Sequence, residues 1–188
     1  MNALIKRFFA LIFSILLCIM TYLVQAESYN KVHIQVDSNK QILNVIKDDL
    51  IIKSYLISTA KNGLGEEQGS FKTPRGKHRI IKKIGYDAPI NTVFVGRLPT
   101  GEVYSPELEK IKPNNDWILT RIMWLDGLES GRNKGGNKDS MQRYIYIHGT
   151  PSSNVMGEPD SKGCIRMHNS DLLELFDLVE EGIEINIF

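Results

Sequence analysis

A cysteine and a histidine in the last quarter of the chain have the side chains that nucleophilic catalysis needs. Cys164 lies in the segment 161–166 and is the only cysteine outside the hydrophobic N-terminal stretch, and His148 ends an apolar segment. The nucleophile is a thiolate, and a thiol with the ordinary pKa of about 8.5 is mostly protonated at neutral pH. A nearby imidazole can take that proton, so the sequence predicts that Cys164 and His148 act as a pair.

The residues around the cysteine predict further roles. Gly163 permits a sharp turn, and we expect its backbone N–H, together with that of Cys164, to face a developing oxyanion. If the segment is extended, Arg166 points to the same face as Cys164. Its fixed charge then lowers the thiol pKa, binds a substrate carboxylate or forms a structural ion pair. Ser161 is expected to hydrogen-bond across the turn.

Strands must position this pair. In the segment 143–148, alternation places Tyr144 and Tyr146 on the face of His148, with the two isoleucines between them in the core. Tyr146 is therefore a candidate substrate contact. The pattern predicts further strands at 32–36, 42–46, 50–57, 78–84, 91–95, 117–124 and 183–187, the first three as an antiparallel meander. Residues 98–102 are expected to form a hairpin turn.

One C-terminal helix is predicted. Asn169 is a candidate N-cap, and Asp171 lies in the first turn, where the helix dipole favours a carboxylate. Apolar residues then recur at helical spacing up to Val179, and Gly182 is expected to end the helix. The segment 125–142, rich in Gly, Asn, Lys and Ser, is predicted to be a long loop: either a flap beside the cleft or a mobile surface loop without a role.

The pattern of chemical residues resembles the L,D-transpeptidase catalytic domain, the YkuD-like family. That family combines His-Gly with Ser/Thr-x-Gly-Cys-aliphatic-Arg and a nearby Asn, and this chain has His148-Gly149, the segment 161–166 and Asn169. The segment 73–76 also resembles the family's Thr-Pro-x-Gly, which supports the active-site sheet. Lys162 departs from the pattern, because the family commonly has His there. The resemblance implies a mainly β fold, a β-sandwich or barrel-like sheet with one C-terminal helix.

The resemblance implies an enzyme that acts on peptidoglycan stem peptides. Cys164 would attack the carbonyl of an L,D peptide bond, in a tetrapeptide that loses its terminal D-Ala, and form a thioester. His148 would be the general base, oriented by the carbonyl of Gly149 in place of a carboxylate. An amine acceptor gives a cross-link or an anchored envelope protein. Water as acceptor gives an L,D-carboxypeptidase or related hydrolase, and a non-catalytic peptidoglycan-binding module is the remaining alternative.

Residues 1–26 resemble a secretory signal peptide. Lys6 and Arg7 precede an apolar run from Phe8, and small residues around Ala26 suit cleavage there. We therefore expect export to the periplasm or cell envelope, with the catalytic domain at 27–188. An uncleaved membrane anchor is the rival interpretation, and a lipoprotein at Cys18 is a weaker one.

Composition excludes several other classes. The full chain has 23 basic and 22 acidic residues. Without residues 1–26, which contain two basic residues and no acidic one, a net charge of −1 remains, which does not favour nucleic-acid binding. The sequence contains no Cys-x-x-Cys pair, which disfavours a thioredoxin-like role. Cys164 and His168 alone are too few ligands for zinc, so we expect no metal site. We also expect no cofactor and a monomeric protein.

Overall fold

The computed structural model describes residues 11–17, 20 and 32–188 of the chain. The expected cleavage position after residue 26, and Cys18, lie outside the described residues. Residues 11–17 are helical. Across the described ranges, we find no helix that combines the length and the hydrophobicity needed to cross a membrane.

The barrel begins with the predicted meander. β1 (Val32–Asp37), β2 (Ile42–Lys47) and β3 (Leu50–Ser58) pair in antiparallel register. Alternation buries Ile34 and Val36 of β1 in the core. The first turn forms because the Asp37 carboxylate accepts hydrogen bonds from the backbone N–H groups of Asn39 and Lys40, at 3.1 and 3.0 Å. Local sequence therefore determines this part of the fold.

The remaining strands close the sheet into a barrel. They are β4 (Gly76–Ile84), β5 (Thr92–Val95), β6 (Leu98–Val103), β7 (Ile118–Gly127), β8 (Tyr146–Gly149), β9 (Ile165–Met167) and β10 (Glu184–Ile187). In the described part of the chain the strand order is β4-β10-β1-β2-β3-β9-β8-β7-β5-β6. β4 also pairs with β7, which makes a closed ring and leaves the β5–β6 hairpin as an extension. The predicted mainly β architecture is confirmed.

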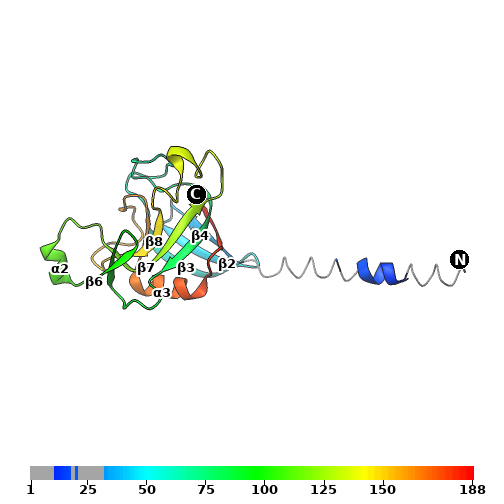
Figure 1. The fold of residues 1–188 in the computed structure, drawn as a ribbon, viewed down its shortest axis with the longest axis horizontal. Coiled ribbons are helices and arrows are strands. Elements are labelled where there is room, and N and C mark those ends of the chain that lie inside the picture. Colours follow the sequence, from blue (N-terminus) through cyan, green and yellow to red (C-terminus); the bar gives the residue numbers. More distant parts are fainter. Residues whose placement is uncertain (1–10, 18–19, 21–31) are drawn as a thin grey trace, which may run out of the picture.

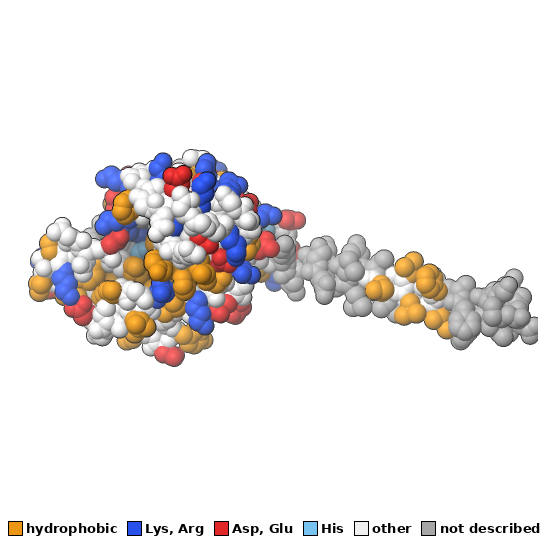
Figure 2. Space-filling model, turned by 45° about the horizontal axis from the view of Figure 1, so that its top comes forward, with side chains coloured by type: hydrophobic (Ala, Val, Ile, Leu, Met, Phe, Trp, Pro, Cys, Tyr) orange, Lys and Arg blue, Asp and Glu red, His pale blue; other side chains and the backbone are white. Residues whose placement is uncertain are grey.

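One helix covers the core of the barrel. α3 (Asn169–Leu178) buries its apolar stripe, Leu172, Leu175 and Phe176, in the same cluster as the inward side chains of β1, β2, β3 and β7 to β10. Figure 1 shows α3 along the lower side of the barrel. The surface mixes both signs of charge. In the view of Figure 2, Lys and Arg are interspersed with Asp and Glu, and hydrophobic atoms gather between them.

The hairpin turn lies at residues 96–97, just before the predicted range of 98–102. Residues 98–102 belong to strand β6, and the turn is Gly96-Arg97, since Val95 pairs directly with Leu98. Both turn residues have positive φ, 56° and 70°, which is the geometry that a two-residue hairpin loop with the right twist requires. The sequence prediction was wrong because Arg at a left-handed position gives no turn signal.

Two helix boundaries also differ from the prediction. His168, not Asn169, is the residue before the first helical turn, and no side chain there makes a capping hydrogen bond. The helix ends at Leu178 with Val179 extended, so Gly182 lies in the following turn, with a φ of 94°. The amide of Asn169 is used in tertiary contacts described below, which explains why it does not cap the helix.

A short helix, α2 (Pro106–Ile111), was not predicted. Ser105 caps it by accepting a hydrogen bond from the N–H of Leu108 at 3.2 Å, Pro106 occupies the first helical position, and acidic residues lie in the first turn. These are ordinary helix-start signals that the sequence contains. α2 lies beside β6 at one end of the molecule (Figure 1).

We expect the buried face of α3 to control stability. Leu175→Ala removes a fully buried side chain from the core, so the free energy of unfolding should fall by about 2–5 kcal/mol. Leu178, in the same helix, is 41% exposed, and Leu178→Ala should cost less than about 1 kcal/mol. Urea unfolding of both variants measures the difference, and equal losses would show that α3 does not pack as described.

Candidate active site

The parallel pairing of β8 with β9 brings the predicted catalytic residues together. Ile147 pairs with Ile165 and His148 with Arg166, so Cys164, one residue before β9, lies beside Tyr146. Opposed residues in a sheet point to the same face, and side chains alternate along each strand. The side chains of Tyr146, His148, Cys164 and Arg166 therefore share one face, and both isoleucines point into the core.

His148 is held in one tautomer. Its side chain is buried, at 2% exposure, and Nδ1 lies 2.8 Å from the carbonyl oxygen of Gly149. A carbonyl can only accept, so Nδ1 carries the hydrogen and Nε2 of the neutral ring is left as an acceptor. Burial lowers the pKa of His148 to about 4, partly opposed by the bond to Gly149. The imidazole is thus neutral at physiological pH.

Cys164 is partly buried and free of any disulfide. Its thiol donates to the carbonyl oxygen of Tyr144 at 3.4 Å, a contact that only the protonated sulfur can make. Burial raises the pKa of the Cys164 thiol to about 12. The backbone N–H of Tyr146 and the charges of Arg166 and Arg143 oppose that shift, and Asp116 adds to it. The resting pair therefore consists of a neutral thiol and a neutral imidazole.

Hydrogen bonds define the turn before Cys164. Ser161 Oγ donates to the carbonyl of Cys164, as a residue bonding across the turn should. Gly163 has a φ of 130°, where a residue with a side chain is strained. Its N–H donates to Ser161 Oγ at 3.2 Å, so this group, expected to face an oxyanion, is bonded rather than free in the resting structure. Thr73 Oγ1 donates to the carbonyl of Gly163 at 3.0 Å, so the segment 73–76 supports this turn directly.

Arg166 forms ion pairs. Its guanidinium lies 2.7 Å from Asp116 and 3.3 Å from Asp160, and the side chain is only 9% exposed. Of the three roles that the sequence left open, the structural ion pair is the one whose contacts are present. Its Nε is buried without a hydrogen-bond partner among the described residues. Sequence analysis did not identify Asp116, which lies between α2 and β7 with no local signal.

Tyr146 belongs to an aromatic and cationic group. Its hydroxyl accepts a hydrogen bond from Arg97 at 3.0 Å, and its ring packs edge-on to Trp124. The guanidinium of Arg97 lies over the rings of Trp124 and Tyr144. Tyr144 is not on the strand face as predicted, because β8 begins at Tyr146 and Tyr144 has a φ of 57°. The backbone carbonyl of Tyr144, and not its ring, accepts the hydrogen bond from Cys164.

A partly buried polar network lies behind Gly149. Thr120 donates to the Asn169 carbonyl oxygen at 2.7 Å, and the Asn169 amide donates to Asn91 and to the carbonyl of Thr150. A side chain at Gly149 would collide with Asn169. Thr120 and Asn91 have φ of 70° and 67°, and strain of this kind persists only where the surroundings impose it. The network thus holds the backbone at Thr150, next to the Gly149 carbonyl that orients His148.

The predicted long loop lies three residues later than expected, at 128–145, and is well anchored. β7 extends to Gly127, so the connection starts at residue 128, and it contains a 3₁₀ turn at Gly136–Lys138. Asn133 is fully buried and donates to the carbonyls of Arg75 and Lys77. At its end, Arg143 donates to the carbonyls of Glu66 and Lys72, at 2.7 and 2.6 Å. The loop therefore ties the segment 63–76 to the cysteine turn.

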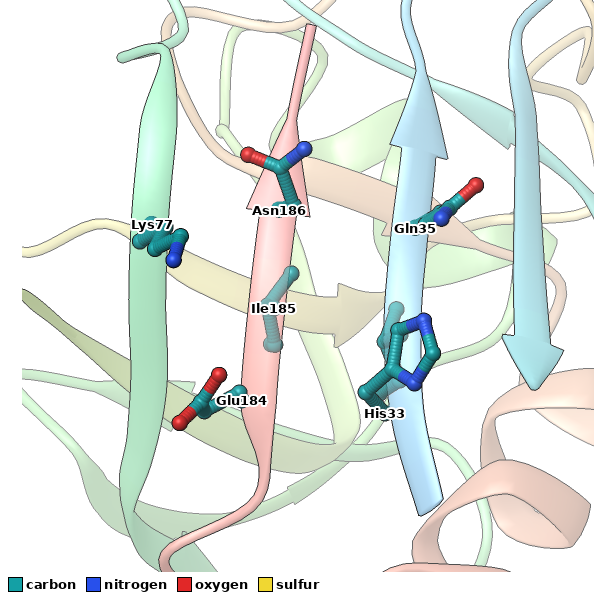
Figure 3. A pocket seen from close by; sticks show the side chains of 7 residues that line it. His33, Gln35, Lys77, Glu184, Ile185 and Asn186 are labelled. Atoms are coloured by element: carbon teal, nitrogen blue, oxygen red, sulfur yellow. The ribbon is translucent and has the colours of Figure 1, made fainter. Parts of the chain in front are cut away.

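A hollow on the outside of the barrel, away from this pair, lacks a thiol or serine nucleophile. One cavity of about 240 Å³ lies on the outer face of β1, β10 and β4, and Figure 3 shows polar side chains of all three strands around it: His33, Gln35, Lys77, Glu184 and Asn186. No thiol or serine hydroxyl is among its lining residues. We therefore place the candidate active site at Cys164 and His148.

The fold is similar to that of known L,D-transpeptidases. LdtMt1 in complex with imipenem superposes with a TM-score of 0.52 and 17% identity over 85% of this chain and 59% of that chain. Bdellovibrio bacteriovorus Bd1075 gives 0.53 and 18%, over 86% of this chain and 49% of that one. At these identities the likeness concerns the fold. It confirms the architecture expected from the motif resemblance.

Sequence similarity is local but stronger. The Bacillus licheniformis protein YkuD is 49% identical over 46 residues, which cover 24% of this chain and 28% of that protein. The aligned segment is thus a minor part of both proteins. The L,D-transpeptidase catalytic domain (YkuD) family matches residues 31–187, the whole barrel and α3. The chain therefore belongs to the L,D-transpeptidase catalytic domain family.

Proposed function

We propose that this protein is a cysteine-dependent L,D-transpeptidase that acts on peptidoglycan stem peptides through an acyl-thioenzyme. Family membership supports the reaction class. The observation that carries the proposal is the His148 ring: its Nδ1–H is donated to Gly149, and Cys164 lies on the same face of the neighbouring strand. A base held in this tautomer beside a lone thiol suits acyl transfer.

The reaction starts from a neutral pair. The Cys164 thiol turns from the Tyr144 carbonyl towards His148, and Nε2 takes its proton as sulfur attacks the carbonyl carbon of the L,D bond. The carbonyl π pair moves to oxygen, and the tetrahedral intermediate then expels the amine, which takes the proton from the imidazolium. A thioester remains on Cys164. An acceptor amine attacks it, His148 takes the amine proton, and the thiol leaves protonated with the new amide formed.

The oxyanion needs a donor other than Gly163, whose N–H is bonded to Ser161. We propose the backbone N–H of Cys164 for this role, since the attacking sulfur places the oxyanion close to its own residue. Tyr146 and Arg97 lie on the same face and form one wall for the peptide. Arg166 keeps the turn in place through its ion pair with Asp116.

Amine and water acceptors lead to different products. With an amine the thioester becomes a cross-link or joins an envelope protein to the stem, and with water it becomes a shortened stem peptide. Membership of the L,D-transpeptidase family supports the amine, because transpeptidation transfers the acyl group to an amine. We therefore propose transfer to an amine as the main reaction.

We also propose that the protein is exported. The basic start, the apolar run and the small residues up to Ala26 support a secretory signal. N-terminal sequencing of the protein from a cell-envelope fraction should begin at residue 27, or at the chain start if the segment remains as an anchor. A cytoplasmic protein that retains Met1 would rule out both forms of export.

Cys164→Ala should abolish turnover of muropeptides, because it removes the nucleophile and leaves the turn's hydrogen bonds intact. Cys164→Ser should also be nearly inactive, since the same base must deprotonate a far weaker acid. The measurements are chromatography of muropeptide products and mass spectrometry for a covalent carbapenem adduct. Substantial activity in the alanine variant would exclude the thiol mechanism.

His148→Ala should slow acylation by a carbapenem about 10²–10⁴-fold, the usual contribution of a general base. His168→Ala is the matched control, because His168 lies at the start of α3 and has no role in the proposed reaction. Circular dichroism must confirm that both variants are folded. If the His168 variant is the slow one, the wrong histidine has been assigned.

The pH profile of the wild type follows from the lowered pKa of His148. The imidazole remains neutral, and so able to act as base, until the pH falls to about 4, and acylation should hold its rate as the pH drops through 6.5. The unfolded chain binds protons more readily at His148 and His78 than the folded protein, because burial lowers the pKa of both side chains. The free energy of unfolding should therefore also fall as the pH drops from 6.5 to about 4. Circular dichroism at each pH separates the two effects, and a decline centred at 6.5 in folded protein contradicts the assignment.

A further inference from the structure

A basic cavity of about 440 Å³ opens beside the cysteine turn. Its lining includes Ser161, Lys162 and Arg166, which belong to the same segment as Cys164, together with Lys61 and Phe71 from the loop after β3. Lys61 is fixed to the turn, because its backbone N–H donates to the carbonyl of Ser161 at 3.0 Å. The cavity is therefore part of the structure that presents the thiol, and its size suits a small ligand.

The charges in this cavity are incompletely balanced. Arg166 is paired with Asp116 and Asp160, and Lys162 lies 3.8 Å from the same Asp116. Lys61 is exposed, and within the described residues it forms no ion pair. Three cations thus share two carboxylates. In addition, Arg166 Nε is buried and unpartnered in the described part of the chain, in a side chain that is only 9% exposed.

Phe71 gives the cavity an apolar wall at a cost in backbone strain. Its side chain is 57% exposed, and its φ is 55°, a conformation that is unfavourable for a bulky residue. The loop on each side is held by hydrogen bonds: Ser70 to Glu67, and Arg143 to the carbonyl of Lys72. Strained residues fixed in this way gather at ligand sites. Exposed aromatic surface next to incompletely balanced positive charge suits a ligand with a carboxylate and a small apolar group.

We propose that Lys61 and Lys162 bind the terminal carboxylate of the donor peptide, with its last side chain against Phe71. The inference rests on the proposed function and specifies its substrate. In a donor cleaved before its last residue, one residue separates the attacked carbonyl from the terminal carboxylate, a span of about 3.3–3.6 Å. Lys162 comes two residues before Cys164, and the Lys61 backbone is hydrogen-bonded to the same turn at Ser161. A carboxylate held on the turn that presents the thiol would favour attack at the last peptide bond over internal ones.

The test compares two synthetic tetrapeptide stems that differ only at the C-terminus, one a free acid and one a primary amide. Wild type should release the last residue from the acid about tenfold or more faster in kcat/KM, the scale of a charge-assisted hydrogen bond. Lys61→Gln with Lys162→Gln should bring that ratio close to one, mainly by raising KM for the acid. The preference of the wild type should also weaken in high salt.

Lys77→Gln is the matched control, since it removes one positive charge on the outer face of β4, in the separate cavity of Figure 3. It should keep the preference for the acid. Equal turnover of both peptides by the wild type, or an unchanged ratio in the double variant, overturns the inference and leaves the proposed function standing.

Binding without turnover separates the two proposals. Calorimetric titration of the Cys164→Ala protein with each peptide should show tighter binding of the acid, and this difference should disappear when both lysines are also replaced. If the wild type turns over neither peptide and this lysine-dependent binding remains, the proposed function fails and the carboxylate site stands. If the two peptides bind equally, the carboxylate site is excluded whatever the turnover.

Discussion

The parallel register of β8 and β9 is the constraint on which the rest of the site depends. It places Cys164 diagonally across from His148 with both side chains on one face, although the chain between them makes a crossover of fifteen residues. A parallel pair cannot be closed by a tight turn, so the strands must be held from outside. β3 on one side and β7 on the other supply that support within the closed barrel.

Behind the two strands, polar groups replace the carboxylate of a conventional triad. The Gly149 carbonyl orients the imidazole, and the Asn169 amide fixes the following peptide through Thr150. Glycine is required at 149 because the Asn169 amide occupies the space of a side chain. The irregular register of β7 at Thr120 belongs to the same arrangement, since Thr120 reaches Asn169 from that point. Local strain and site geometry are thus linked.

Burial determines how the chemistry can proceed. It lowers the pKa of His148 and raises that of Cys164, so both groups are neutral at rest, and in the proposed reaction charge develops only as the bond forms. Arg166 stands nearby, but Asp116 and Asp160 already neutralise most of its charge. Positive charge that is incompletely balanced lies further out, on Lys61 and Lys162 of the neighbouring cavity, where we propose that it binds the donor carboxylate.

The sequence by itself determined the strands with clear alternation, the β1–β3 meander, the apolar stripe of α3 and the choice of Cys164 and His148 as candidate catalytic residues, because these depend on local periodicity and on side-chain chemistry. It did not determine the hydrogen-bond and ion-pair partners around the candidate site. Asp116, Thr120 and Arg143 carry no local signal and make their contacts only where distant segments meet. It also misplaced the Gly96-Arg97 turn and the cap at Asn169, where tertiary contacts outweighed local preference. The free N–H expected at Gly163 was lost for the same reason, since a hydroxyl two residues away took it once the turn had closed. Long-range contacts decide such details because each hydrogen-bonding group is satisfied by whatever the folded chain brings nearest.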